Sequence, residues 1–185
     1  PEKARELLMA LSSYFRNMLD DIDSSVTLET ELEHVKAYLM LEEARFEEHL
    51  KIRIEAEPED LTCRVPNLIL QPIVENAVRH GAMKRDKGQV TIRIKKEEKS
   101  TMIDVIDNGP GMDKEIVDRL YENGSSQLPH QNEGHGIGML NVQRRLTGIF
   151  GKGAGLQIIS GGSGTIVRMI IPNQKERTDE DCGSR

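Results

Sequence analysis

The chain has 185 residues, of which 37% are hydrophobic and 30% charged, and its formal net charge at pH 7 is −6. This length allows one domain with a single core and a smaller appendage. The acidic balance argues against a nucleic-acid-binding surface, which needs an excess of basic residues. Cys63 and Cys182 lie outside any metal-ligand spacing, and no apolar run could cross a bilayer. We expect a soluble protein without a structural disulfide.

The N-terminal residues predict two helices. Within 4–19, apolar residues recur at spacings of three and four, as on one face of a helix: Leu8, Leu11, Phe15 and Met18. This face needs a partner, and its short length leaves a helical hairpin as open as a coiled coil. A second helix is expected from about Thr27, which can cap it, to Phe46.

The central residues mix strand and helix patterns. Residues 50–56 alternate apolar and charged side chains, which predicts a strand with one wet face. Residues 67–81 return to a helical period and stop at Gly81, which we interpret as a C-cap. Segments 90–95 and 102–107 predict an antiparallel pair of strands joined by a charged turn.

The remaining residues complete one domain. We expect a short helix at 113–121, a polar loop at 122–137 typical of a lid or of disorder, a helix at 139–149, and strands at 156–160 and 165–171. The fold class is therefore α+β, a two-layer sandwich with a mixed, mostly antiparallel sheet and helices on one face. We divide the chain into a helical arm at 1–46, a main domain at 47–172 and a disordered tail at 173–185.

The helix expected at 67–81 carries the first group of polar residues. Residues four apart share one strip of a helix, which gives one strip of Pro72, Asn76 and His80 and a second of Gln71, Glu75 and Arg79. An exposed ion pair between Glu75 and Arg79 explains this pattern without any site. In the alternative, Asn76 offers the hard oxygen donor that Mg²⁺ prefers.

Two glycine-bearing segments follow. In "DNGPG", Asp107 either ends a strand before a turn or accepts a hydrogen bond from an amine such as that of adenine, while Gly109 and Gly111 leave bare backbone beside the ring. In "GHGIGM", three alternate glycines precede a helix, which is either a hinge or an anion site made of backbone N–H groups. Each motif alone is weak.

Taken in order, these motifs and "GSGT" at 162–165 form a specific series. The series resembles the ATP-binding domain of sensor histidine kinases, gyrase-type topoisomerases, heat-shock chaperones and mismatch-repair ATPases, called the Bergerat or GHKL fold. This resemblance covers about residues 50–172. It implies Mg²⁺ at Asn76 and ATP contacts at these residues: Asn76, Arg79, His80, Asp107, Gly109, Gly111, Met112, Gly134, His135, Gly136, Ile137, Gly138, Met139 and Thr165.

The resemblance narrows to one branch. ATP-hydrolysing members carry an acid about one helical turn before the asparagine, whereas this chain has Gln71 in that region. An amide is a poor general base, so phosphoryl transfer is favoured over hydrolysis. The segments "LETELEHVKAYLMLEEARF" and "LILQPIVENAVRHG" are similar to those of sensor histidine kinases of the LytS or YehU type.

The phosphoacceptor histidine of that type lies in a Pro-His-Phe-x-Phe-Asn segment, which these residues lack. The chain is therefore expected to be a catalytic fragment, and Glu75 is its candidate catalytic side chain. We expect His34 to be a solvated surface histidine, and at least one of Arg144 and Arg145 to be exposed.

The resemblance also implies partners for the parent. These are the phosphoacceptor helix of the same kinase, a response regulator and a second copy in a homodimer. The parent is expected to be a bacterial membrane sensor with this domain in the cytoplasm. A protein-serine kinase of the same fold and a nucleotide-sensing module without transfer activity remain alternatives.

Overall fold

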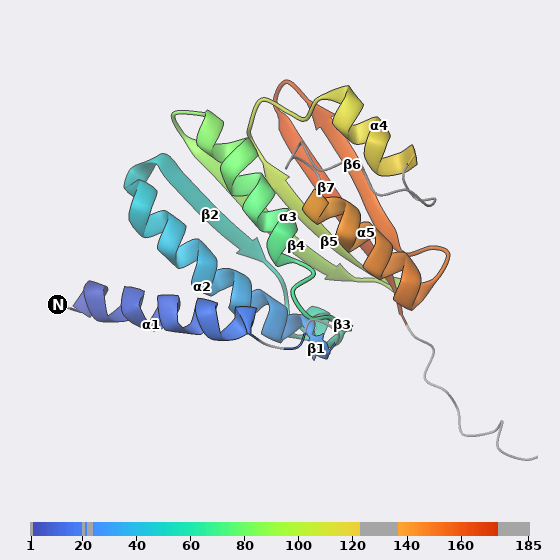
Figure 1. Ribbon diagram of the computed structural model, residues 1–185, viewed down its shortest axis with the longest axis horizontal. Helices are drawn as coiled ribbons and strands as arrows, with labels where there is room; N and C mark the ends of the chain where they lie inside the picture. The colour runs from blue at the N-terminus through green and yellow to red at the C-terminus, as the bar shows by residue number, and fades with distance from the viewer. Residues whose placement is uncertain (1, 20, 22–23, 123–136, 174–185) are drawn as a thin grey trace, which may run out of the picture.

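A five-stranded sheet covered by helices on one face forms the body of the protein (Figure 1). The computed structural model describes residues 2–19, 21, 24–122 and 137–173. Along the sheet the strands run in the order β2 (Leu50–Glu55), β4 (Gly88–Lys96), β5 (Ser100–Asp107), β7 (Gly164–Pro172) and β6 (Gly155–Gly161). Only the β2–β4 pair is parallel, so the expected mixed, mostly antiparallel sheet is confirmed.

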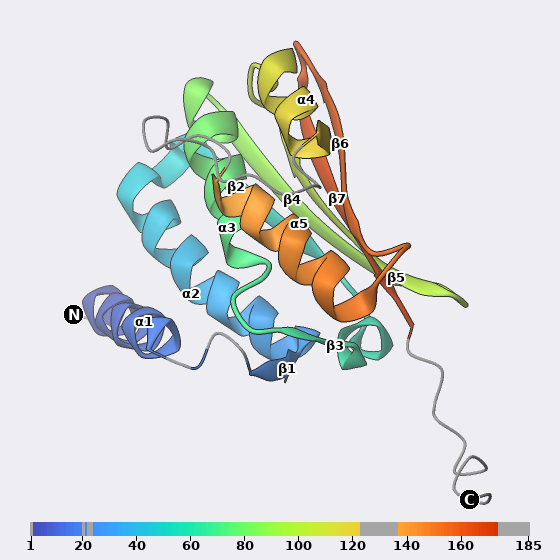
Figure 2. The ribbon, with the colours of Figure 1, turned by 45° about the vertical axis from the view of Figure 1, so that its right-hand side comes forward.

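Helices α2 (Leu28–Phe46), α3 (Gln71–Asn76), α4 (Lys114–Glu122) and α5 (Ile137–Phe150) lie on the same side of this sheet (Figure 2). Helix α1 (Glu2–Met18) lies outside them, against α2. Among the described residues, none of these helices is both long and apolar enough to cross a bilayer.

Helix α2 is part of the main hydrophobic core. Thr27 caps it as expected, because its Oγ1 accepts a hydrogen bond of 3.2 Å from the backbone N–H of Thr30. One apolar face of this helix is buried: Leu28, Leu32, Val35 and Leu39. These side chains share one cluster with Ile92 and Ile103 of the sheet, so the second half of the predicted helical arm packs directly on the main domain.

The helix expected at 67–81 has different boundaries. Residues 67–70 form a loop, and α3 begins only at Gln71. After Asn76 the backbone widens into a π-helical segment, η3 (Ala77–Gly81), followed by the short 3₁₀ segment η4 (Ala82–Lys84). Segments of this kind often occur at functional sites.

Several short elements were not predicted from the sequence. Strands β1 (Ser25–Thr27) and β3 (Arg64–Pro66) pair antiparallel at the edge of the body. Two 3₁₀ segments, η1 (Glu47–His49) and η2 (Pro58–Thr62), flank β2. With three residues, β1 and β3 are too short for alternating polarity to reveal them.

Candidate nucleotide site

A cavity of about 180 Å³ opens between α3 and its π-helical continuation, the ends of β5 and β7, and α4 and α5. Its walls are largely apolar, with a few polar groups, as in many sites for organic ligands. The lining residues are Ile73, Asn76, Ala77, His80, Gly81, Asp107, Gly111, Met112, Asp113, Ile116, Met139, Thr165 and Val167.

Asp107 is the buried carboxylate of this cavity. It is the last residue of β5 and is only 7% exposed. The backbone N–H of Gly109 donates to its Oδ1 at 2.8 Å. Burial raises the pKa of the Asp107 carboxyl above 3.8, although hydrogen bonds from the backbone of Gly109 and Thr165 oppose the increase.

Thr165 lies directly opposite Asp107, because the two residues are partners in the β5–β7 register. Its Oγ1 is 3.3 Å from the Oγ of Ser160, whose hydroxyl also accepts a 2.6 Å hydrogen bond from the backbone N–H of Met112. Strands β6 and β7 thus fix the far wall of the cavity, which supports the segment that follows Asp107.

Glycines let backbone segments pack closely around Asp107. A Cβ at Gly81 would overlap the Asp107 side chain, and one at Gly109 would overlap the backbone of Gly81. Gly81 has φ −97°, and Ala82 is the C-cap of its helical segment, so the interpretation of Gly81 as a C-cap is wrong. Close approach to Asp107 therefore explains Gly81 better than helix termination does. Gly111 has φ +93°, a left-handed conformation that side chains disfavour.

Asn76 and His80 both reach the cavity, one turn apart along α3 and η3. Asn76 is half-buried and His80 is exposed. In the described part of the chain, no group of three His, Cys, Asp or Glu side chains could hold a metal ion. Asn76 brings an amide oxygen to the cavity, a donor of the kind that suits Mg²⁺, because this ion often takes few protein ligands and completes its shell with water and phosphate.

Glu75 and Arg79 do not line this cavity. The Glu75 carboxylate accepts a 2.8 Å hydrogen bond from the side chain of Gln71, and the hydroxyl of Tyr14 lies 3.5 Å away. Arg79 is exposed, and its charge acts on Tyr38 of α2. The structure therefore places both side chains on the side of α3 that faces the helical arm.

The remaining predicted ATP contacts are only partly described. Met112 and Met139 line the cavity, whereas Ile137 is 46% exposed at the start of α5. Gly138 lines a neighbouring cleft between α3 and α5, together with Gln71 and Glu75. The remaining residues of the loop lie outside the described part of the chain: Gly134, His135 and Gly136.

Sequence reasoning missed several wall residues. Ile73 and Ala77 lie beside Asn76 on the same helical face, a position that the spacing of three and four would have revealed. Ile116 and Asp113 come from α4 and the segment before it, for which the sequence predicted only a helix and its cap. Val167 follows Thr165 by two residues and so faces the same side of β7.

Two expectations about charged residues were wrong. His34 is only 8% exposed, and its Nδ1 lies 3.7 Å from the Glu31 carboxylate. Arg144 and Arg145 are both partly buried, and Arg145 donates a 2.8 Å hydrogen bond to the carbonyl of Asn67. These side chains therefore help to hold the helices together.

Comparison with known families gives two matches. Residues 64–175 match the family described as histidine kinase-, DNA gyrase B-, and HSP90-like ATPase, and residues 1–50 match the histidine kinase family. The LytS sensor protein of Oceanobacillus iheyensis is 37% identical over 175 residues, which cover 92% of this chain and 29% of that protein. The sensor histidine kinase/phosphatase LytS of Staphylococcus aureus is 36% identical over 181 residues, with 96% and 30% covered. The chain thus spans about 30% of the length of these relatives.

Solved structures show the same fold. The histidine kinase domain of the Erythrobacter litoralis blue-light activated kinase matches with a TM-score of 0.55 and 20% identity, covering 93% of this chain and 80% of that one. The catalytic domain of histidine kinase ThkA matches with a TM-score of 0.60 and 15% identity, covering 82% and 98%.

Proposed function

Because the chain belongs to the family of histidine kinase-, DNA gyrase B- and HSP90-like ATPases, we propose that it binds ATP with Mg²⁺ and transfers the terminal phosphoryl group to a histidine of its parent kinase. The expected likeness to LytS sensor kinases is confirmed. What we propose beyond this likeness is the phosphoryl transfer, the binding of Mg²⁺ and the roles of the individual residues.

The buried Asp107 carboxylate at the cavity wall is the observation that carries the proposal. A carboxylate accepts hydrogen bonds, and an adenine amino group is a donor that fits a narrow apolar cavity. Thr165 beside it offers a hydroxyl, and Gly81 and Gly111 line the same cavity without side chains. Asp107 would therefore select the base.

The phosphates would extend from this pocket toward Asn76 and the N-terminus of α5. Asn76 would hold Mg²⁺, which neutralises phosphate charge when bound. His80 lies close enough to the cavity to contact the nucleotide. The proposed glycine loop before α5 would supply backbone N–H groups to the phosphates.

The chain is better suited to transfer than to hydrolysis. Neither Gln71 nor Pro72, five and four residues before Asn76, carries a carboxylate that could activate water. In the proposed step, an imidazole nitrogen forms a bond to the terminal phosphorus while the bond to the bridging oxygen breaks. ADP leaves, and the imidazole loses its proton.

Further partners follow from the proposed kinase activity. One protein of similar structure, the histidine kinase ThkA, has been solved in complex with the response regulator TrrA. We infer that the parent of this chain likewise passes its phosphoryl group to a response regulator, works as a homodimer and presents this domain in the cytoplasm.

A labelling experiment tests the transfer. The chain is incubated with ATP labelled at the terminal phosphate and with a separately produced helical segment that carries the parent's phosphoacceptor histidine. We expect label on that segment that is lost in acid, as phosphohistidine is, and no label with Asp107→Asn. Acid-stable label would indicate a serine kinase. Nucleotide binding without label would indicate a sensing module.

A further inference from the structure

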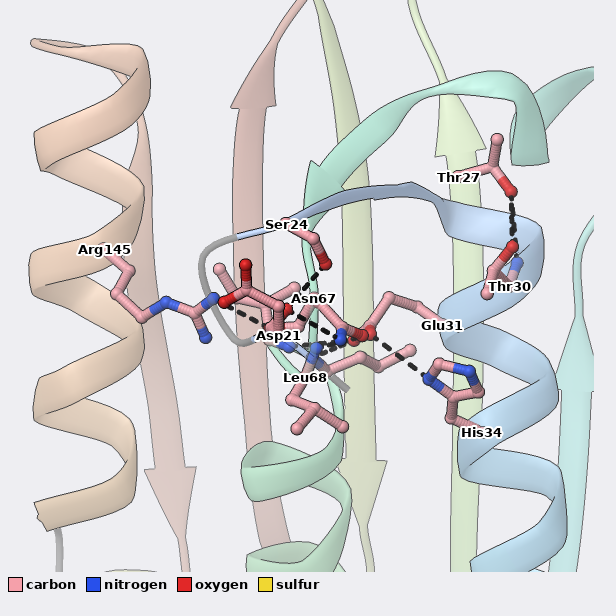
Figure 3. Close-up of polar contacts among 11 residues, drawn as sticks. Asp21, Ser24, Thr27, Thr30, Glu31, His34, Asn67, Leu68 and Arg145 are labelled. Carbon is pink, nitrogen blue, oxygen red and sulfur yellow. Dashed lines mark hydrogen bonds and ion pairs between the residues drawn. The ribbon is translucent and has the colours of Figure 1, made fainter. Parts of the chain in front are cut away.

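Glu31 is a buried carboxylate that lies outside the nucleotide cavity. It belongs to the first turn of α2 and has 0% exposure. Its Oε1 accepts a hydrogen bond of 2.6 Å from the backbone N–H of Leu68. Its Oε2 accepts bonds of 2.8 Å from Ile69 and 2.9 Å from Leu70 (Figure 3). One side chain of α2 therefore satisfies three consecutive N–H groups.

These N–H groups need such an acceptor. They belong to the loop that leads into α3, where no earlier turn of the helix supplies carbonyl groups. Ile69 and Leu70 are fully buried, so water does not replace the carboxylate. Leu68 has φ +56°, a left-handed conformation that directs neighbouring N–H groups to one point. Without Glu31 this backbone would be strained and unsatisfied.

Other contacts hold the same loop from both sides. The backbone N–H of Asn67 donates to the carbonyl of Ser24 at 3.0 Å. The backbone carbonyl of Asn67 accepts the hydrogen bond from Arg145 of α5 (Figure 3). The loop thus connects α2, α5 and the start of α3, and Glu31 supplies the negative charge that matches its aligned N–H groups.

We propose that Glu31 is a positioning residue for the nucleotide site: by clamping residues 68–70 it fixes α3, and so sets where Asn76 stands in the cavity. This inference rests on the proposed binding of Mg²⁺ and ATP. Asn76 lies at the end of α3, six residues after Leu70. A displacement of α2 relative to the sheet would therefore reach the metal-binding side of the cavity, while Asp107 on β5 would keep its position.

The substitution Glu31→Gln tests the clamp at nearly constant size. A glutamine has one acceptor oxygen, and its NH₂ group would face at least one of the backbone donors that the carboxylate now accepts. It also removes the charge that strengthens these bonds. Exchange of the backbone N–H groups of residues 68–70 with deuterium should become at least about tenfold faster. Exchange in β4, an interior strand of the sheet, should not change.

The functional readout is the gain in ATP affinity on adding Mg²⁺, measured by calorimetry for the full chain. We expect Glu31→Gln to lower this gain about tenfold and to leave Mg²⁺-free binding close to that of the wild type. Thr27→Ala is the matched control: it removes the cap of the same helix and leaves residues 68–70 untouched. Thr27→Ala should lower the melting temperature and keep the full Mg²⁺ gain.

The outcomes separate the two proposals. If Glu31→Gln keeps the full Mg²⁺-dependent increase in ATP affinity, the role of Glu31 is overturned and the proposed function is not. The same holds if Thr27→Ala loses as much of this increase as Glu31→Gln does. A wild-type chain that shows no Mg²⁺ gain would overturn the proposed role of Asn76, and the inference with it. If Glu31→Gln does not fold, Glu31→Asp replaces it. The aspartate keeps the charge but is one methylene shorter. We therefore expect faster exchange at residues 68–70 and a reduced Mg²⁺-dependent gain in ATP affinity, both by less than in Glu31→Gln.

Discussion

Asp107 is held as a buried carboxylate, a state that opposes folding and that we propose serves ligand binding. The cavity removes water from it, and only backbone N–H groups are placed to offset that loss. Perturbed pKa values are common at functional sites, so the raised pKa of this carboxyl supports the proposed role of Asp107.

This conflict predicts that Asp107→Asn stabilises the ligand-free chain near neutral pH. Because the folded pKa lies above 3.8, Asp107 favours folding most at low pH, and this contribution is lost as pH rises through the raised pKa. Asparagine has no such dependence, and its oxygen can still accept the N–H of Gly109. Thermal unfolding should show a higher melting temperature for the variant at pH 7 and a smaller difference as the pH falls.

Asp86→Asn is the control for a change of one charge. Asp86 is exposed, so its substitution should change the free energy of unfolding by about 0.5 kcal/mol or less. A variant at Asp107 that is less stable than the wild type at pH 7, or a difference that does not vary with pH, would contradict the argument.

At the scale of elements, Asp104 and Arg168 couple the central strands on the sheet face away from the helices. They are register partners in β5 and β7. The guanidinium donates two hydrogen bonds to the carboxylate, of 2.7 and 2.8 Å. The Asp104 side chain is only 9% exposed, so this pair differs from an ordinary surface ion pair.

Arg168→Ala should therefore lower the free energy of unfolding by about 2 kcal/mol, because it leaves a buried carboxylate without its partner. Arg53→Ala is the comparison: its ion pair with Glu55 spans 3.8 Å, and the Arg53 side chain is 75% exposed. That variant should change stability by about 0.5 kcal/mol or less. Urea unfolding measures both, and equal losses would refute the distinction.

The elements also show what the sequence reveals. Strict alternation in β4 and the charged turn that joins it to the next apolar segment predicted both strands and their antiparallel pairing. The loop at 67–70 was misread as helix because its buried apolar residues mimic a helical period. What fixes it as a loop is Glu31, which is 37 residues away from Leu68. Contacts of this range leave no local pattern.

For the candidate site, too, the sequence revealed some residues and misled on others. Asp107, Asn76 and Thr165 could be chosen because their motifs are short and ordered along the chain. Glu75 and Arg79 belong to the same motif, but the rotation of α3 in the fold turns them toward α1 and α2. Burial of His34 was hidden because the adjacent Glu33 and the charged flank of the helix suggested a solvated face.

At the scale of the whole molecule, α1 presents an apolar surface. Its inner side contacts α2 through buried Ala10 and through Tyr14, whose ring centroid lies 6.1 Å from that of Tyr38. The outer side exposes large apolar side chains with exposed fractions of 67% for Leu8, 64% for Met9 and 56% for Phe15. The predicted apolar face of this helix is therefore mostly uncovered.

We expect this surface to mediate self-association, in line with the proposed homodimer. Analytical ultracentrifugation of the chain should show a concentration-dependent dimer, and Leu8→Glu with Phe15→Glu should weaken it at least about tenfold. Ile159→Glu, at a similarly exposed apolar residue of β6, should leave it unchanged. A monomer at every concentration would contradict the expectation.

The measurement that tests the central claim most directly is a calorimetric titration of the chain with ATP, with and without Mg²⁺. Wild type should bind, and Mg²⁺ should strengthen the binding. Asp107→Asn should weaken binding about tenfold to a hundredfold, and Asn76→Ala should lose only the Mg²⁺-dependent part. No binding by the wild type at millimolar ATP, or an affinity unchanged in Asp107→Asn, would contradict the assignment of this cavity as the nucleotide site.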